Sequence, residues 1–123
     1  MVLATTNKPQ RLLFVSYAGR VEPGEFDRGW DELKALIAEL QPGYRVLVDT
    51  TNLEFMDPEC ATEVGRVMEL LDKSGIGLII RVMPDESKDI GMNILTIFHF
   101  KRKPRIINCQ NLAEAIKKLS LFP

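Results

Sequence analysis

The stretch LVDTTNLEFMDPEC, residues 47–60, decides the fold class of this chain. It begins at the end of an apolar segment, residues 44–48, continues through a polar and acidic turn, and ends in DPE, residues 57–59, which can start a helix. A buried strand that leads through a short connection into a helix is the repeating unit of α/β proteins. Functional crevices of open α/β sheets lie at the carboxyl ends of the strands, so we expect this connection to lie at the functional edge.

Length and composition are those of one ordinary globular domain. The chain has 123 residues, of which 46% are hydrophobic and 27% charged, which is enough for a hydrophobic core. The net charge of -1 gives no reason to expect nucleic-acid binding. The sequence shows neither a bilayer-spanning apolar run nor signal-peptide features, so we expect a cytoplasmic protein without membrane insertion. Cys60 and Cys109 have no metal spacing and are expected to be free thiols.

Hydrophobic periodicity predicts four strands that alternate with four helices. The predicted strands cover residues 11–18, 44–48, 76–83 and 106–109, and the helices cover 25–40, 58–73, 87–98 and a last segment after Asn111. This alternation implies a single domain, residues 11–123, with helices packed on a mostly parallel β-sheet. Residues 1–10 are polar and are expected to be a disordered or extended lead. Gly29 weakens the first predicted helix, and close packing is the one reason for it that the sequence offers.

Residues 57–60 have the composition of a well-formed helix start. Asp57 is expected to cap the first amides and Pro58 to take the first helical position. Glu59 gains about 0.3–1 kcal/mol from the helix dipole. A thiolate at Cys60 is favoured by the same dipole, but no catalytic motif accompanies it and a packed thiol is expected. A structural role therefore explains the whole segment.

Several short motifs give the chain a resemblance to a known family. They are VLVD at residues 46–49, LEFMD at 53–57, Gly75 before the third strand, MPD at 83–85 and LAEA at 112–115. In their order and spacing they make residues 11 to 120 resemble a STAS domain, the module named for sulfate transporters and anti-anti-sigma factors. Residues 80–99 are similar to the same stretch of uncharacterised bacterial STAS-like proteins. The resemblance implies a SpoIIAA-like fold and supplies no enzymatic activity.

The STAS resemblance also implies a role for Glu59. In that family the segment after the aspartate is typically Ser-Ser-Gly, and a partner kinase phosphorylates one hydroxyl in the anti-anti-sigma members. This chain has Pro58-Glu59-Cys60 after Asp57, so the hydroxyl position falls on Glu59. A glutamate carries one permanent charge, against about −1.5 to −2 for phosphoserine. The hypothesis is an acidic site at residues 57–60 that binds a kinase-like or sigma-regulating protein without responding to phosphorylation there.

Thr50, Thr51 and Asn52 follow the second predicted strand and form a second candidate site. They bind a ligand or accept a modification, or else they satisfy backbone groups in a turn. The basic segment KRKPR, residues 101–105, is either an anion site or a solvated loop.

His99, the only histidine, shares a predicted helix face with Met92 and Leu95. The inward face of that helix is expected to carry Ile90, Ile94, Ile97 and Phe98. The second stripe is either an exposed patch that dimerises or docks a partner, or part of a helix that is buried on two sides and ends at His99. The second alternative is favoured.

No group of residues supplies a nucleophile, a base and a charge stabiliser together, so the chain is not predicted to be an enzyme. No cofactor or metal site is expected. The function expected is a non-enzymatic regulatory or protein-interaction module, for which a homodimer is one option. The alternative is a sensor domain that binds a small anion, a nucleotide or a lipid.

Overall fold

The computed structural model describes residues 1–85 and 89–123, and within the third helix it describes side chains from Ile94 onward. Its elements follow in the order β1 (Val2–Asn7), β2 (Leu12–Tyr17), β3 (Gly19–Val21), α1 (Pro23–Ala38), β4 (Arg45–Asp49), β5 (Leu53–Met56), α2 (Cys60–Lys73), β6 (Leu78–Val82), α3 (Asp89–His99), β7 (Arg105–Cys109) and α4 (Leu112–Leu121). Within this described part of the chain, no helix is both long and apolar enough to cross a bilayer.

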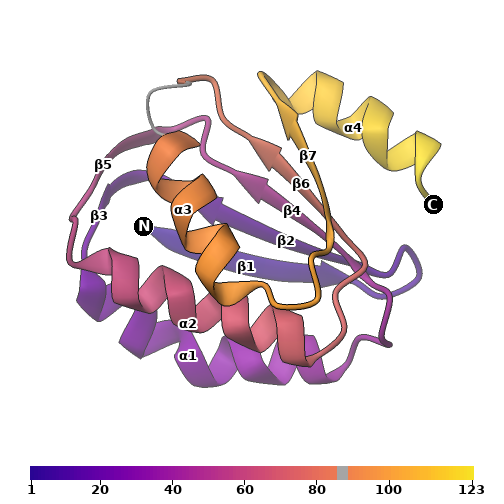
Figure 1. The fold of residues 1–123 in the computed structure, drawn as a ribbon, viewed down its shortest axis with the longest axis horizontal. Helices are drawn as coiled ribbons and strands as arrows, with labels where there is room; N and C mark the ends of the chain where they lie inside the picture. Colours follow the sequence, from indigo (N-terminus) through magenta and orange to yellow (C-terminus); the bar gives the residue numbers. More distant parts are fainter. Residues whose placement is uncertain (86–88) are drawn as a thin grey trace.

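A five-stranded sheet in the order β1-β2-β4-β6-β7 forms the centre of the molecule (Figure 1). The pairs β2–β4, β4–β6 and β6–β7 are parallel, and only β1–β2 is antiparallel. The four predicted strands and the four predicted helices are all present. The expectation of an α/β fold with a mostly parallel sheet is confirmed.

Residues 2–7, which we expected within a disordered or extended lead, form the edge strand β1. They pair with β2 along their whole length, from Val2 opposite Tyr17 to Asn7 opposite Leu12. Alternate residues Val2 and Ala4 pack against the main core. The segment is therefore extended, and it also belongs to the sheet, which its polar composition did not indicate.

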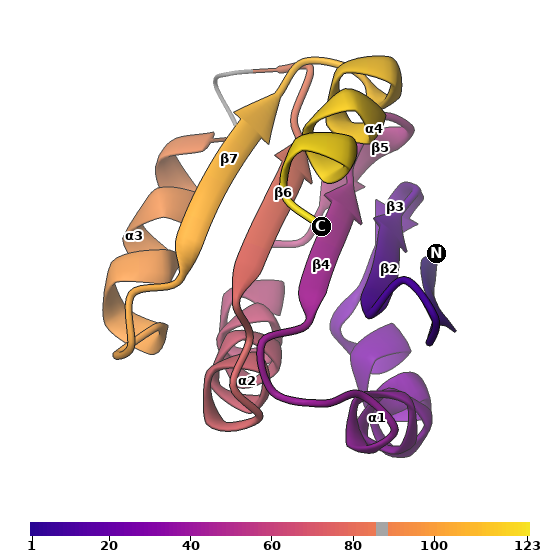
Figure 2. The same cartoon turned by 90° about the vertical axis from the view of Figure 1, so that its right-hand side faces the viewer.

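The two faces of the sheet carry separate hydrophobic layers, because successive side chains of a strand point to opposite faces. On one face, the cross-strand row of Leu13, Val46, Ile79 and Ile106 packs with α1 and α2 in the larger core. On the other, the row of Phe14, Leu47, Ile80 and Ile107 packs with α4. Figure 2 shows this division, with α1, α2 and α3 on one side of the sheet and α4 on the other.

A second, two-stranded parallel sheet pairs β3 with β5 beside the start of α2. Neither strand was predicted from the sequence. Val21 of β3 lies opposite Met56 of β5, and the chain then enters the turn that precedes α2. The small sheet therefore fixes where the predicted site at residues 57–60 lies.

Candidate functional site

The turn before α2 is held by backbone hydrogen bonds to β3. The Asp57 amide donates to the Val21 carbonyl at 3.0 Å, and the Asp57 carbonyl accepts from the Cys60 amide at 2.8 Å. The Asp57 carboxylate accepts from the Glu59 amide at 2.9 Å. A short acidic side chain commonly bonds the backbone two residues on in this way. The residue therefore stabilises a turn.

The expected helix start is wrong by about two positions. The helix begins at Cys60 and its N-cap is Glu59, so Asp57 is not the cap and Pro58 lies in the turn before the helix. The Asp57 carboxylate reaches the nearest free amide, which belongs to Glu59, and the first helical amides lie further on. The Asp57 carboxylate accepts a backbone hydrogen bond as expected, but this bond stabilises a turn and not the first turn of the helix.

Glu59 is exposed and immediately precedes α2. Its side chain forms no capping hydrogen bond with the first turn of the helix. Helix N-termini stabilise negative charge, so an ionised carboxylate is compatible with this position. We name Asp57 and Glu59 the acidic lip. Phe55, in β5, flanks it with a ring that is 40% exposed and lies under the Arg20 guanidinium at 4.6 Å.

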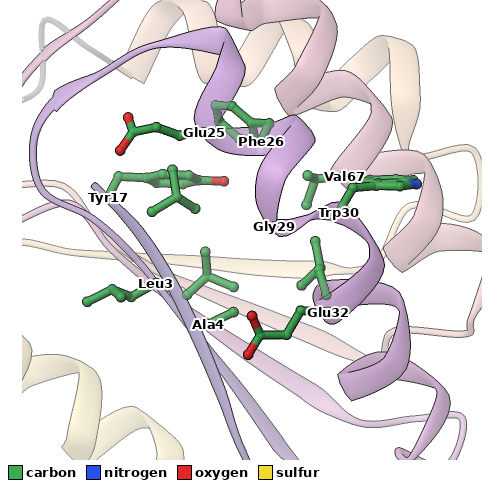
Figure 3. Close-up of a pocket in the computed structure, with 12 residues that line it drawn as sticks. Leu3, Ala4, Tyr17, Glu25, Phe26, Gly29, Trp30, Glu32 and Val67 are labelled. Atoms are coloured by element: carbon green, nitrogen blue, oxygen red, sulfur yellow. The ribbon is translucent and has the colours of Figure 1, made fainter.

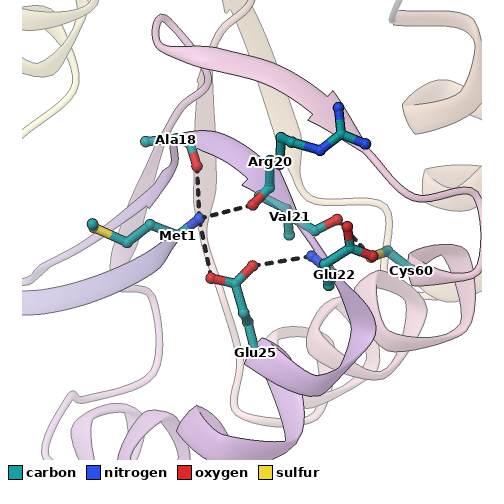
Figure 4. Close-up of polar contacts among 7 residues, drawn as sticks. All are labelled: Met1, Ala18, Arg20, Val21, Glu22, Glu25 and Cys60. Atoms are coloured by element: carbon teal, nitrogen blue, oxygen red, sulfur yellow. Dashed lines mark hydrogen bonds and ion pairs between the residues drawn. The ribbon is translucent and has the colours of Figure 1, made fainter.

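Cys60 is completely buried, and its thiol lies 3.6 Å from the Val21 carbonyl (Figure 4). Burial raises the pKa of this thiol, and the Asp57 carboxylate raises it further. These effects outweigh the favourable helix dipole, so the group is a packed neutral thiol. Of the four residues of the predicted site, Cys60 offers no surface to a partner.

The second candidate site, Thr50 to Asn52, lies at the carboxyl end of β4. Thr50 is 7% exposed, and its hydroxyl donates to the Val82 carbonyl at 2.6 Å. Thr51 and Asn52 are exposed. The Thr51 amide and hydroxyl both donate to the Asp49 carboxylate. Both threonine hydroxyls therefore donate to acceptors of the chain itself. The charged group in contact with them is the Asp49 carboxylate, which is negative.

The face of α3 that we expected to be the second stripe packs against α2. Leu95 is half-buried against the main core, and the His99 Nδ1 lies 3.0 Å from Glu69 Oε1 of α2. The His99 ring occupies a notch at Gly65, where an added Cβ would come within 2.5 Å of its Nε2. The third member of the stripe, the Met92 side chain, lies outside the described residues.

The predicted inward face of α3 is exposed. Ile94, Ile97 and Phe98 are exposed by 51%, 78% and 72%, which reverses the expected orientation of the helix. They lie three and four residues apart and so form one contiguous apolar strip. The side chain of Ile90 lies outside the described residues. We name Ile94, Ile97 and Phe98 the α3 face. The exposed basic side chains of Lys101, Arg102 and Lys103 follow it in the chain.

Arg81 is a buried charge that the sequence analysis did not single out. It is 5% exposed, and its Nε donates to Asn108 Oδ1 at 2.9 Å, while its guanidinium lies 3.5 Å from Thr96 Oγ1 of α3. Buried charges need such partners, because desolvation is costly. The signal in the sequence was a lone arginine inside the apolar run of residues 78–83.

Within residues 1–85 and 94–123, no three acidic, histidine or cysteine side chains come together as a metal site. The described part of the chain therefore offers two surfaces of interest, the acidic lip and the α3 face. Both can bind a protein, since one supplies carboxylates and the other a strip of apolar side chains.

No known family and no curated protein matches the sequence. Solved structures do match. An uncharacterised DUF3478-family protein from Shewanella loihica PV-4, described as having a SpoIIAA-like fold, is 12% identical with a TM-score of 0.72, over 97% of this chain and 92% of that one. The anti-sigma factor antagonist SpoIIAA in its unphosphorylated form is 16% identical with a TM-score of 0.62, over 98% of both chains. An anti-sigma factor antagonist from Mycobacterium paratuberculosis is 14% identical with a TM-score of 0.58, over 98% and 93%.

These similarities extend over nearly the whole chain and show its fold. The fold is SpoIIAA-like, so the fold that the STAS resemblance implied is confirmed. At these identities the comparison concerns the fold, since one fold hosts many functions.

Proposed function

We propose that this chain is a non-enzymatic regulatory module, active in the cytoplasm, that binds another protein through the α3 face and the acidic lip. The fold is shared with two structures described as anti-sigma factor antagonists, which supports a regulatory protein as the partner. A kinase-like or sigma-regulating protein is the partner class that this analogy favours. The chain's own surface provides the physical argument.

The α3 face is the observation that carries the proposal. Single exposed apolar residues are normal on protein surfaces, but adjacent large ones mark interaction sites. Ile94, Ile97 and Phe98 are adjacent on one helix, and each exposes at least half of its surface. Such side chains supply the anchors that dominate binding energy when a partner covers them.

The acidic lip supplies charge at a separate position, at the start of α2. Exposed charges set association rate and selectivity more than affinity. A glutamate supplies a carboxylate here without any modification, whereas a serine would need a kinase to become anionic. The proposed site is therefore permanently acidic, and its partner carries basic or amide groups opposite Glu59.

The test of the α3 face uses three tagged variants and the parent chain. Ile97→Ser and Phe98→Ser each remove one apolar anchor, while Leu121→Ser removes a side chain that is 67% exposed on α4, on the opposite side of the sheet. We expect quantitative mass spectrometry of affinity captures to find a protein that the parent and Leu121→Ser retain and the other two lose. A capture that all four share equally would contradict the proposal.

The test of the acidic lip uses Glu59→Gln, with Asp31→Asn as the matched control, because the Asp31 side chain on α1 is 97% exposed. We expect Glu59→Gln to slow association of the captured partner several-fold at low salt and to reduce its salt dependence, since one charge is removed. Asp31→Asn should leave both unchanged. Glu59→Ser should behave like Glu59→Gln until it is phosphorylated. Equal rates and salt dependence for the parent and Glu59→Gln would refute a role for this carboxylate.

A further inference from the structure

Gly29 has no structural reason to be glycine. It lies inside α1, where glycine is less favourable than alanine. Its φ angle is an ordinary negative one, and an added Cβ would meet no heavy atom of the described residues within 4 Å. The close packing expected from the sequence is therefore absent, and open space lies where a side chain would be.

This open space is part of a pocket between α1 and β1, with a volume of about 130 Å³. Val15 is among the residues of the sheet that line it. Tyr17 also lines it from the sheet, and Phe26, Gly29 and Trp30 line it from the helix (Figure 3). An apolar cavity of about 150 Å³ in another protein binds benzene. The pocket therefore has room for one aromatic ring or a short alkyl chain.

The charged side chains among the described lining residues are both acidic, Glu25 and Glu32. With Gly29 they lie four and three residues apart on one face of α1, so they bracket the open space over about 10 Å of helix (Figure 3). Glu25 is occupied, because its carboxylate accepts from the Glu22 amide at 3.0 Å and pairs with the Met1 ammonium at 3.1 Å (Figure 4). Glu32 is exposed and has no ion pair with any residue that the structure describes.

The aromatic lining adds to this preference for positive charge. Tyr17, Phe26 and Trp30 line the pocket, and the faces of aromatic rings attract cations. Arg66 already lies over the Trp30 ring at 4.3 Å, but it is neutralised by Glu63 at 2.8 Å and Asp27 at 3.4 Å. An anionic ligand would meet two carboxylates and no lining cation, whereas an ammonium would find a partner in Glu32.

We propose that this pocket binds a small organic cation, an ammonium group joined to an aromatic ring or a short alkyl chain. The apolar part occupies the space beside Gly29, and the ammonium lies at Glu32. This site is separate from the α3 face and the acidic lip, and it makes the chain a ligand-responsive module.

The single tryptophan of the chain, Trp30, reports directly on this pocket. The probe is 2-phenylethylammonium, and phenylacetate and 2-phenylethanol are its anionic and neutral counterparts. We expect a saturable change in tryptophan fluorescence with the ammonium, and binding at least about tenfold weaker with phenylacetate, since a charge reversal at one ion pair is worth that much.

Two variants locate the ligand. Gly29→Leu fills the space with a good helix former, so it should abolish binding while circular dichroism and the melting temperature show an intact fold. Glu32→Gln should weaken the ammonium several-fold and leave 2-phenylethanol unchanged. Phe98→Ser, which tests the partner surface, should bind the probe as the parent does, so the two proposals fail separately.

Three results would overturn the proposal: no saturable response at millimolar ammonium, equal binding of phenylacetate, or unchanged binding in Gly29→Leu. A nitrogen–proton NMR titration detects binding even if the ligand does not change the fluorescence of Trp30. Amide shifts at Ala4, Val15 and Gly29 support the pocket, whereas shifts confined to other residues, or no shifts at all, reject it.

Discussion

Gly65 and Gly29 both lie inside helices of the same layer, and their surroundings are opposite. At Gly65 an added Cβ would come within 2.5 Å of the His99 ring, so the missing side chain lets α3 dock on α2. At Gly29 an added Cβ meets nothing, and the vacant space opens into the pocket beside β1. Each glycine weakens its helix by roughly 1 kcal/mol relative to alanine. The contact with His99 explains the first cost, whereas no contact of the described residues explains the second.

The largest expected effect that distinguishes the two glycines is at Gly65. Gly65→Val should destabilise the chain by about 1–3 kcal/mol, because the new side chain and the His99 ring compete for one volume. Urea unfolding measures the change. In the His99→Ala background the same substitution should cost less, which a double-mutant cycle detects. An equal cost in both backgrounds would mean that the notch does not depend on His99.

Gly29→Ala should have a smaller effect with the opposite sign. The new methyl meets no atom, so the gain in helix propensity should raise the free energy of unfolding by about 0.5–1 kcal/mol. The same urea unfolding experiment tests it, with Gly65→Ala as the matched comparison. Destabilisation by Gly29→Ala would show that the space beside α1 is not open in solution.

The smallest effect concerns the hydrogen bond between His99 and Glu69, which accompanies the notch at Gly65. Hydrogen bonding with His99 lowers the pKa of Glu69 below its ordinary value of 4.5. A carboxyl with a lowered folded-state pKa stabilises the protein above its unfolded pKa, and this contribution is lost as the pH falls through the folded pKa. Stability curves of the parent and Glu69→Gln should therefore differ slightly at neutral pH and converge below pH 4.5. Curves that diverge further on acidification would contradict this assignment.

The central sheet could be predicted because most of its strands contain a run of apolar residues in the local sequence. Residues 45–49 and 78–82 are almost entirely apolar or buried, as strands covered on both faces must be. The edge strand β1 and the small β3–β5 sheet lack this signal. The second half of β1 is polar, and β3 has three residues, so both depend on partners far away in the sequence.

The candidate sites were predictable in position more than in orientation. Asp57 and Glu59 were identified as acidic residues at the start of the second helix, although the helix begins later than expected. The two apolar stripes of α3 were visible in the sequence, but periodicity does not tell which stripe faces inward. That choice depends on Gly65 in another helix, a contact between residues 34 positions apart. The one sequence feature that indicated the pocket was Gly29, a glycine inside a predicted helix for which close packing was the only reason offered.

The central claim is that the α3 face binds a protein partner, and the dissociation constant of the captured partner tests it most directly. Isothermal titration calorimetry should show binding about 30-fold weaker for Phe98→Ser than for the parent, since a buried aromatic anchor contributes roughly 2 kcal/mol or more. Leu121→Ser should bind as the parent does, and all three melting temperatures should agree. Equal dissociation constants for the parent and Phe98→Ser would contradict the account.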